Sequence, residues 1–254
     1  MPGSATESST IDTGMATVLL LIALAQGAQC TPEATTLMNA ATARAALFDL
    51  AGAVQRMQAA AQSGCADAML PALYLRGWIA ARDAYRVGGS PESLRPVLQS
   101  IATLQDTGGK SGRAQIEALV LQAAAAAAQS ERDELASMIE YAVQLEDRNV
   151  SAGLPALPMV TAHEAAGDLW LQVHRYDEAR KAYERASKRV GVTPRVTLGL
   201  ARVAARLDAV TTACTQYRRL VDSWKTSTEN PPEIAEARTF LANPMCQTAA
   251  TPRP

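Results

Sequence analysis

Residues 160–225 repeat a pattern of small and aromatic side chains with a period of 34 positions. The equivalent pairs are Gly167 and Ala201, Ala179 and Ala213, Tyr183 and Tyr217, and Ala186 and Leu220. Small residues let two helices cross closely, and aromatic residues fill the space between one helical hairpin and the next. The period therefore predicts a stack of helical hairpins, in which each hairpin buries its apolar face only against its neighbours.

The composition favours helices along the rest of the chain as well. About one residue in five is alanine, and aromatic residues make up only 4% of the 254 residues. Valine and isoleucine are sparse, which leaves little for a β-sheet to use, whereas alanine, leucine, arginine, glutamine and glutamate are good helix formers. We therefore expect an all-α protein that is long enough to bury a core of its own.

The segment LWLQVHRYDEARKAYERA, residues Leu169–Ala186, resembles the tetratricopeptide repeat (TPR) as it occurs in bacterial proteins. The copy that follows it is a weaker match, because Ala204 stands where the family usually has an aromatic residue. The resemblance implies a right-handed α-solenoid of antiparallel helix hairpins, and we expect about eleven helices in the chain.

The same pattern divides the chain into four parts. Residues 1–25 form a leader that resembles a signal peptide, and residues 26–159 hold degenerate TPR-like hairpins separated by inserts. Residues 160–242 contain two TPR-like repeats and a capping helix. Residues 243–254 are rich in Thr, Pro and Ala, so we expect them to be a disordered tail.

The leader contains an apolar run, MATVLLLIALA at Met15–Ala25. This length is about right for the core of a signal peptide and short for a membrane span. The small residues at its end predict cleavage before Gln26 and export to the periplasm; uncleaved, the run would be the chain's only contact with the membrane. The preceding residues are acidic rather than basic, so a start at Met15 and a cytoplasmic chain with a packed apolar helix are alternatives, as is a lipoprotein anchored at Cys30.

Two pairs of cysteines lie where antiparallel hairpins bring their ends together. Cys30 precedes one predicted helix and Cys65 follows its partner helix, so their side chains should be neighbours. Cys214 lies near the start of another predicted helix, and Cys246 lies just past the next one. We therefore predict two disulfides, each stabilising one end of the array by about 2–4 kcal/mol. The alternative is four free thiols in a reducing cytosol.

Few side chains in the sequence could carry chemistry. His163 and His174 are eleven residues apart and point in different directions on a straight helix, and no spacing indicates a zinc site or a Ser-His-Asp triad. The sequence GKS at 109–111 lacks the earlier glycine of a phosphate-binding loop. A net charge of −1 argues against a general nucleic-acid binder. We expect no catalytic residue, no metal site, no cofactor and no enzyme activity.

The resemblance also implies a binding surface, because in the family the first helix of each repeat lines a concave groove. The matching positions supply six candidate partner-binding residues: Glu164, Asp168, Gln172, Arg195, Arg202 and Arg206. A groove that is half acidic and half basic could hold an extended peptide, with the arginines binding carboxylates. Alternatively, Asp168 and Arg202 pair with each other, since they are equivalent positions on adjacent helices, and the other arginines form a solvated face.

These observations lead to a functional expectation that names no individual partner. The chain is expected to be a non-enzymatic protein–protein interaction scaffold or adaptor of the TPR type, which acts in the bacterial envelope by binding an extended peptide or a partner protein. The alternative is a detached regulatory TPR module of a cytosolic kinase or transcription-regulator system. An all-α enzyme with an unrecognised site is a third hypothesis. A processed N-terminus with oxidised cysteines would favour the first of these.

Overall fold

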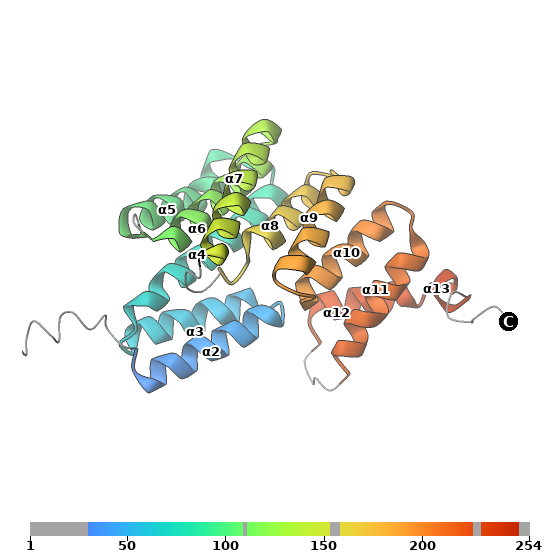
Figure 1. Cartoon of the computed structure of the whole chain (residues 1–254), viewed down its shortest axis with the longest axis horizontal. Helices are drawn as coiled ribbons and strands as arrows, with labels where there is room; N and C mark the ends of the chain where they lie inside the picture. Colours follow the sequence, from blue (N-terminus) through green and yellow to red (C-terminus); the bar gives the residue numbers. More distant parts are fainter. Residues whose placement is uncertain (1–29, 109–110, 153–157, 226–229, 249–254) are drawn as a thin grey trace, which may run out of the picture.

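The computed structural model describes residues 30–108, 111–152, 158–225 and 230–248 (Figure 1). Within these ranges the regular structure is entirely helical, as the composition predicts, and twelve α-helices and one short 3-10 helix compare with about eleven helices expected. The predicted leader and its cleavage site before Gln26 lie outside the described residues. The elements are α2 (Pro32–Ala46), α3 (Leu50–Gln62), η1 (Ala66–Ala68), α4 (Met69–Arg86), α5 (Pro91–Gly108), α6 (Gly112–Ala128), α7 (Arg132–Ser151), α8 (Ala162–Gln172), α9 (Tyr176–Arg189), α10 (Pro194–Arg206), α11 (Val210–Ser223), α12 (Pro232–Leu241) and α13 (Pro244–Thr248).

Consecutive helices pair into hairpins along the whole chain. The closest packing is within α2–α3, α4–α5, α6–α7, α8–α9 and α10–α11, and α12 packs on α11. The second helix of each hairpin also packs on the first helix of the next one. Figure 1 shows the hairpins following one another in an arch, so that the first hairpin and α12 lie on the same side of the molecule. This serial arrangement is that of an α-solenoid.

The turns inside the five hairpins share one backbone feature. The first helix is followed in each by a residue with a positive φ: Phe48 (65°), Gly88 (86°), Ser130 (65°), His174 (62°) and Asp208 (55°). Each follows directly on the residue that caps the first helix of its hairpin. In the α4–α5 turn Gly89 has a second positive φ, of 65°. The repeat is therefore present in the backbone of residues 30–152, where the sequence pattern is degenerate.

Alanine makes up much of the core of the first three hairpins, beside large buried side chains such as Trp78 and Tyr74 of α4. Helix α6 ends in the run 123–128, which consists only of buried alanines, and its other buried residues include Ile116, Val120 and Leu121. It packs against α4, α5, α7 and α8. Side chains this small let helices approach closely on every side, so α6 has no polar face along most of its length.

An aromatic side chain separates the hairpins of the second half. The Tyr183 ring on α9 lies between Gly167 of α8 and Gly199 of α10, and a Cβ added at Gly167 would lie 2.5 Å from the ring. Gly167 is buried and Ala201 is fully buried. The predicted close approach at Gly167 is confirmed. Gly199 is a second small position that the 34-residue pattern did not indicate.

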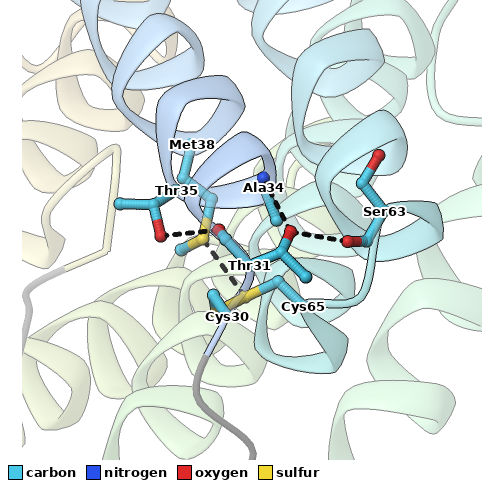
Figure 2. The surroundings of a disulfide bond; sticks show 7 residues. All are labelled: Cys30, Thr31, Ala34, Thr35, Met38, Ser63 and Cys65. Atoms are coloured by element: carbon cyan, nitrogen blue, oxygen red, sulfur yellow. Dashed lines mark hydrogen bonds between the residues drawn. A yellow bond between two sulfur atoms is a disulfide. The ribbon is translucent and has the colours of Figure 1, made fainter.

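Both predicted disulfides are present in the structure. Cys30 is bonded to Cys65 across the base of the first hairpin, with their Cα atoms 4.5 Å apart. Figure 2 shows the neighbouring Thr31, whose hydroxyl donates to the Ser63 carbonyl at 2.7 Å and also caps α2. The start of α2 and the end of α3 are thus joined by a covalent bond and a hydrogen bond.

The second disulfide fixes the C-terminal end of the array. Cys214 on α11 is bonded to Cys246, and their Cα atoms are 5.4 Å apart. Although residues 243–254 were expected to be disordered, Pro244–Thr248 form helix α13. Arg218 donates to the Cys246 carbonyl, which adds a polar contact to the covalent one. The expectation of disorder was wrong for these residues because the disulfide at Cys246 holds them against α11.

Candidate functional site

A groove of about 770 Å³ lies where α8, α10 and α12 converge. The C-terminal ends of α8 and α10 form two of its walls, α12 forms the third, and one side chain of α11 reaches it from below. The lining residues are Leu171, Gln172, His174, Arg202, Ala205, Arg206, Tyr217, Glu236, Thr239 and Phe240. The groove therefore combines an apolar surface with two arginines and a carboxylate.

An ion pair joins two walls of the groove. Arg202 on α10 binds Glu236 on α12 through two hydrogen bonds, Nε to Oε1 at 2.9 Å and Nη2 to Oε2 at 2.5 Å. The Tyr217 hydroxyl donates to the same Oε1 at 2.9 Å. A guanidinium with two parallel bonds to one carboxylate is held in a fixed orientation. The groove is therefore preorganised by contacts within the chain.

These contacts also set the charge state of the groove. Burial opposes ionisation of Glu236, but the hydrogen bonds and positive charge of Arg202 outweigh it and hold the pKa of that carboxyl below its usual value. Burial and the Glu236 charge raise the pKa of the Tyr217 hydroxyl above its ordinary value. Glu236 is thus an anion and Tyr217 a neutral donor across the physiological range.

Arg206 supplies the positive charge that is left over. It lies four residues after Arg202 on α10, which places both on one face of the helix, and its side chain is exposed at the rim. Among the described residues, no carboxylate forms an ion pair with it, whereas Arg202 is bound to Glu236. A ligand carboxylate would therefore meet one uncommitted guanidinium and one that is already paired.

The apolar part of the groove lies next to these charges. The Phe240 and Tyr217 rings pack with their centroids 4.7 Å apart, and Leu171 and Ala205 line the opposite walls. His174 lies at the end of α8, exposed, with its Nδ1 2.9 Å from the Tyr176 hydroxyl. A side chain of a bound peptide could contact this apolar surface while its charge reached Arg206.

The six predicted partner-binding residues fall into two groups. Gln172, Arg202 and Arg206 line the groove, whereas Glu164, Asp168 and Arg195 line only smaller cavities nearer the first hairpin, one of which Arg202 also reaches. Glu164 is buried; it forms the capping box of α8 with Thr161 and accepts from Thr193 at 2.8 Å. These contacts account for Glu164 as part of the packing between α8 and α10.

Asp168 and Arg202 do not form the cross-repeat pair that was considered as an alternative. Asp168 instead pairs with Arg195 at 3.4 Å and accepts from the Tyr183 hydroxyl at 2.5 Å, while Arg202 pairs with Glu236. Burial lowers the pKa of Arg202, but the hydrogen bonds and charge of Glu236 outweigh it and raise that pKa above its usual value, and the more distant charge of Asp168 adds to the rise.

Sequence reasoning missed the contribution of α12 to the groove. Glu236, Thr239 and Phe240 all line it, but the sequence analysis treated this helix only as a cap. A usable signal was present, since Glu236 lies 34 residues after Arg202 and thus one repeat period further on. Helix α12 therefore occupies the place of the first helix of a further hairpin.

No protein family, curated protein or solved structure matches the chain in comparisons with known proteins. In the part of the chain that the structure describes, no cluster of His, Cys, Asp and Glu could hold a metal ion. None of the helices there is both long and apolar enough to cross a bilayer. The functional assignment therefore depends on the groove and the disulfides.

Proposed function

We propose that the protein is a non-enzymatic scaffold or adaptor of the TPR type, which binds an extended segment of a partner protein in the groove between α8, α10 and α12. One observation carries the proposal: the exposed Arg206 lies beside an apolar wall in a groove that is already ordered by the Arg202–Glu236 pair. Preorganised polar groups beside an apolar surface are typical of binding sites. The groove volume of about 770 Å³ suits a few residues of extended peptide.

The charges favour a segment that combines a carboxylate with an apolar side chain. Arg206 would bind the carboxylate, and the surface formed by Leu171, Ala205 and Phe240 would cover the apolar side chain. Glu236 repels any carboxylate that approaches α12, so the negative group should lie at the α10 side. This asymmetry would give a bound segment one preferred direction.

The disulfides support export as part of this proposal. Two disulfides in one chain are typical of proteins that fold in an oxidising compartment. This property and the apolar run in the leader support a location in the bacterial envelope, and the periplasm is the proposed compartment. The cytosolic regulatory module is correspondingly disfavoured, because reducing conditions would leave four thiols.

Binding of a defined peptide tests the groove. The probe is a fluorescein-labelled ten-residue peptide of alternating Glu and Leu, and the matched probe has Gln in place of Glu. We expect fluorescence anisotropy to show binding of the Glu peptide that weakens as salt is added, because the contact to Arg206 is exposed. Equal binding of the two probes would contradict the charge recognition.

Two arginine variants locate the binding. Arg206→Ala should weaken the Glu peptide by about two- to fivefold, the usual contribution of an exposed charge, while thermal stability stays unchanged. Arg219→Ala is the matched control, since it removes the same charge from an exposed position on α11 that does not line the groove. If both variants bind the peptide equally well, the groove is not the site.

A further inference from the structure

The turn of the first hairpin reaches across the molecule to the C-terminal hairpins. Leu47 and Phe48, between α2 and α3, pack against the apolar cluster that includes Leu198 and Trp224. The Phe48 and Trp224 rings are stacked, with centroids 5.7 Å apart and planes at 26°. Figure 1 shows the α2–α3 hairpin extending towards α12. The two ends of the arch are thus in contact.

The backbone conformation of this turn disfavours a bulky apolar residue at position 48. Phe48 has a φ of 65°, in the left-handed region that suits glycine, asparagine or aspartate and disfavours bulky side chains. The equivalent turns carry Gly88, Ser130, His174 and Asp208 at this position, and Phe48 is the one apolar residue among them. Strained residues persist where another contact holds them. For Phe48 that contact is the Trp224 ring.

The contact closes over charged residues of the concave face. Leu50 and Arg82 on the N-terminal side and Asp168 and Arg195 on the other side line a common cavity with Phe48. Its volume is about 20 Å³, room for about one water molecule. The Arg195 side chain is only 12% exposed, although it belongs to the concave face. The first hairpin therefore covers the part of the concave face that contains Asp168 and Arg195. The groove lies on the same face, beside the covered part.

The closing contact is narrow. Neither α2 nor α3 packs along α10, α11 or α12 within the described ranges as hairpin neighbours do. The turn meets the C-terminal cluster through its two apolar side chains, and α2 faces the start of α10 across a cavity of about 230 Å³. Small interfaces between parts of one chain permit relative motion. The hairpin is otherwise held through α3 and η1, which pack on α4.

We propose that the stacking of Phe48 on Trp224 is a clasp that keeps the first hairpin closed over Asp168 and Arg195, and that its release opens this charged pair to a partner that engages the whole concave face. The opening is a property of the chain alone. The role of the opened face in recognition rests on the proposed function, so the experiment measures the opening without any ligand.

The central variant is Phe48→Asn, because asparagine tolerates the left-handed backbone while removing the ring. Ser130→Asn is the matched control at the equivalent turn of α6–α7. Phe48→Trp retains an aromatic ring and should stay closed. Circular dichroism at increasing temperature first establishes that each variant is folded, which is expected because residue 48 lies in a turn outside the helices.

The readout is the reaction of arginine side chains with phenylglyoxal, followed by mass spectrometry of the full chain's peptides. In the wild-type protein Arg195 should react several-fold more slowly than the exposed Arg206. In Phe48→Asn the rate at Arg195 should rise several-fold and that at Arg206 should not change. Ser130→Asn and Phe48→Trp should react like the wild type.

Small-angle X-ray scattering gives an independent measure of the same opening. We expect the radius of gyration of Phe48→Asn to exceed that of the wild type and of Ser130→Asn by about 1 Å or more, against roughly 18 Å for a compact chain of this length. An unchanged Arg195 reaction rate together with an unchanged radius would overturn the clasp. Loss of peptide binding in the groove, by contrast, would leave these results intact and would count only against the proposed function.

Discussion

Helix α6 in the first half and helix α8 in the second each pack against four other helices, but their neighbours are spaced by different side chains. Around α6 the contacts are made largely by alanine, including the buried run 123–128. Beside α8 the Tyr183 ring lies between two glycines, and its hydroxyl binds Asp168. Alanine side chains bring helices close together but orient no polar group, whereas the tyrosine links the core to a charged side chain on the concave face.

The difference explains where the candidate binding residues gather. In the first half the buried carboxylate of α6, Glu117, binds Arg113 one turn earlier on the same helix, whereas the alanine side chains offer no polar group to a neighbouring helix. In the second half Tyr183 binds Asp168, and Tyr217 binds Glu236, so that buried rings hold concave carboxylates in place. These carboxylates in turn bind Arg195 and Arg202. The groove is thus an extension of the aromatic core of the second half.

Removing either disulfide should have the largest effect on stability. Cys214→Ala with Cys246→Ala opens a loop with a sequence separation of 32, and Cys30→Ala with Cys65→Ala opens one of 35. Loops of this size give about 2–4 kcal/mol each, so the two double variants should lose similar free energies of unfolding in urea. A loss confined to one pair would show that the two ends of the array contribute unequally.

The junction between the two halves should make stability depend on pH. Burial raises the pKa of the Glu146 carboxyl to about 7, although the backbone amides of Ala162 and His163 at the start of α8 stabilise its charged form. Facing groups on α8, α7 and α4 are Glu164, Asp147 and Tyr74. A raised pKa means that the folded chain holds this proton more tightly than the unfolded chain.

The free energy of unfolding should therefore fall as the pH rises from about 4.5 to about 7, by up to about 3 kcal/mol from this group. Urea unfolding across this range, for the wild type and Glu146→Gln, measures the contribution. The variant keeps an acceptor for the Ala162 amide but cannot ionise, so its pH dependence should be flatter. Parallel profiles for the two proteins would show that Glu146 does not titrate in this range.

A large side chain should destabilise the protein more beside the Tyr183 ring than at an exposed position. Gly167→Leu forces a side chain into the Tyr183 ring and should lower the free energy of unfolding by about 1–3 kcal/mol. Ala235→Leu introduces the same side chain at an exposed position of α12 and should change stability by less than about 0.5 kcal/mol. Thermal unfolding of both variants gives the comparison, and equal melting temperatures would contradict the close approach at Gly167.

The smallest effects should come from single hydroxyl groups, one in each half. Tyr74 donates to the Val160 carbonyl at 2.7 Å, and Tyr183 donates to Asp168. Replacing either tyrosine with phenylalanine should lower the free energy of unfolding by about 0.5–1.5 kcal/mol. Only Tyr183→Phe should also speed the reaction of Arg195 with phenylglyoxal, because Asp168 loses a contact that holds it. Equal reaction rates would mean that the core does not position the concave charges.

The repeat of the second half could be predicted from the sequence because the aromatic residues between its hairpins differ from the residues around them. Tyr183 and Tyr217 stand out at a period of 34, whereas in the run 123–128 every position is alanine and no period can be read. The repeat persists there only as backbone conformation, as at Ser130. The cysteine pairs were predictable because a hairpin brings its two ends together whatever its core contains.

The site was less predictable, because its residues come from contacts between distant segments. Counting along one helix correctly placed Arg202 and Arg206 on a common face, but it could not show that Glu236 already binds Arg202. Nothing in the spacing of Phe48 indicated that it meets Trp224, more than half the chain away. Periodicity describes what each repeat shares, and these contacts depend on how the whole array curves.

The left-handed turns have a consequence for how such a chain can vary in length. Their positions are separated by 40 residues from Phe48 to Gly88, 42 to Ser130, 44 to His174 and 34 to Asp208. The turn has three residues in four of these hairpins and four in α4–α5, so most of the difference in length is taken up by the helices and by the connections at the opposite edge. Insertions and deletions can thus accumulate along that edge without disturbing the turns, and it is there that related chains would diversify.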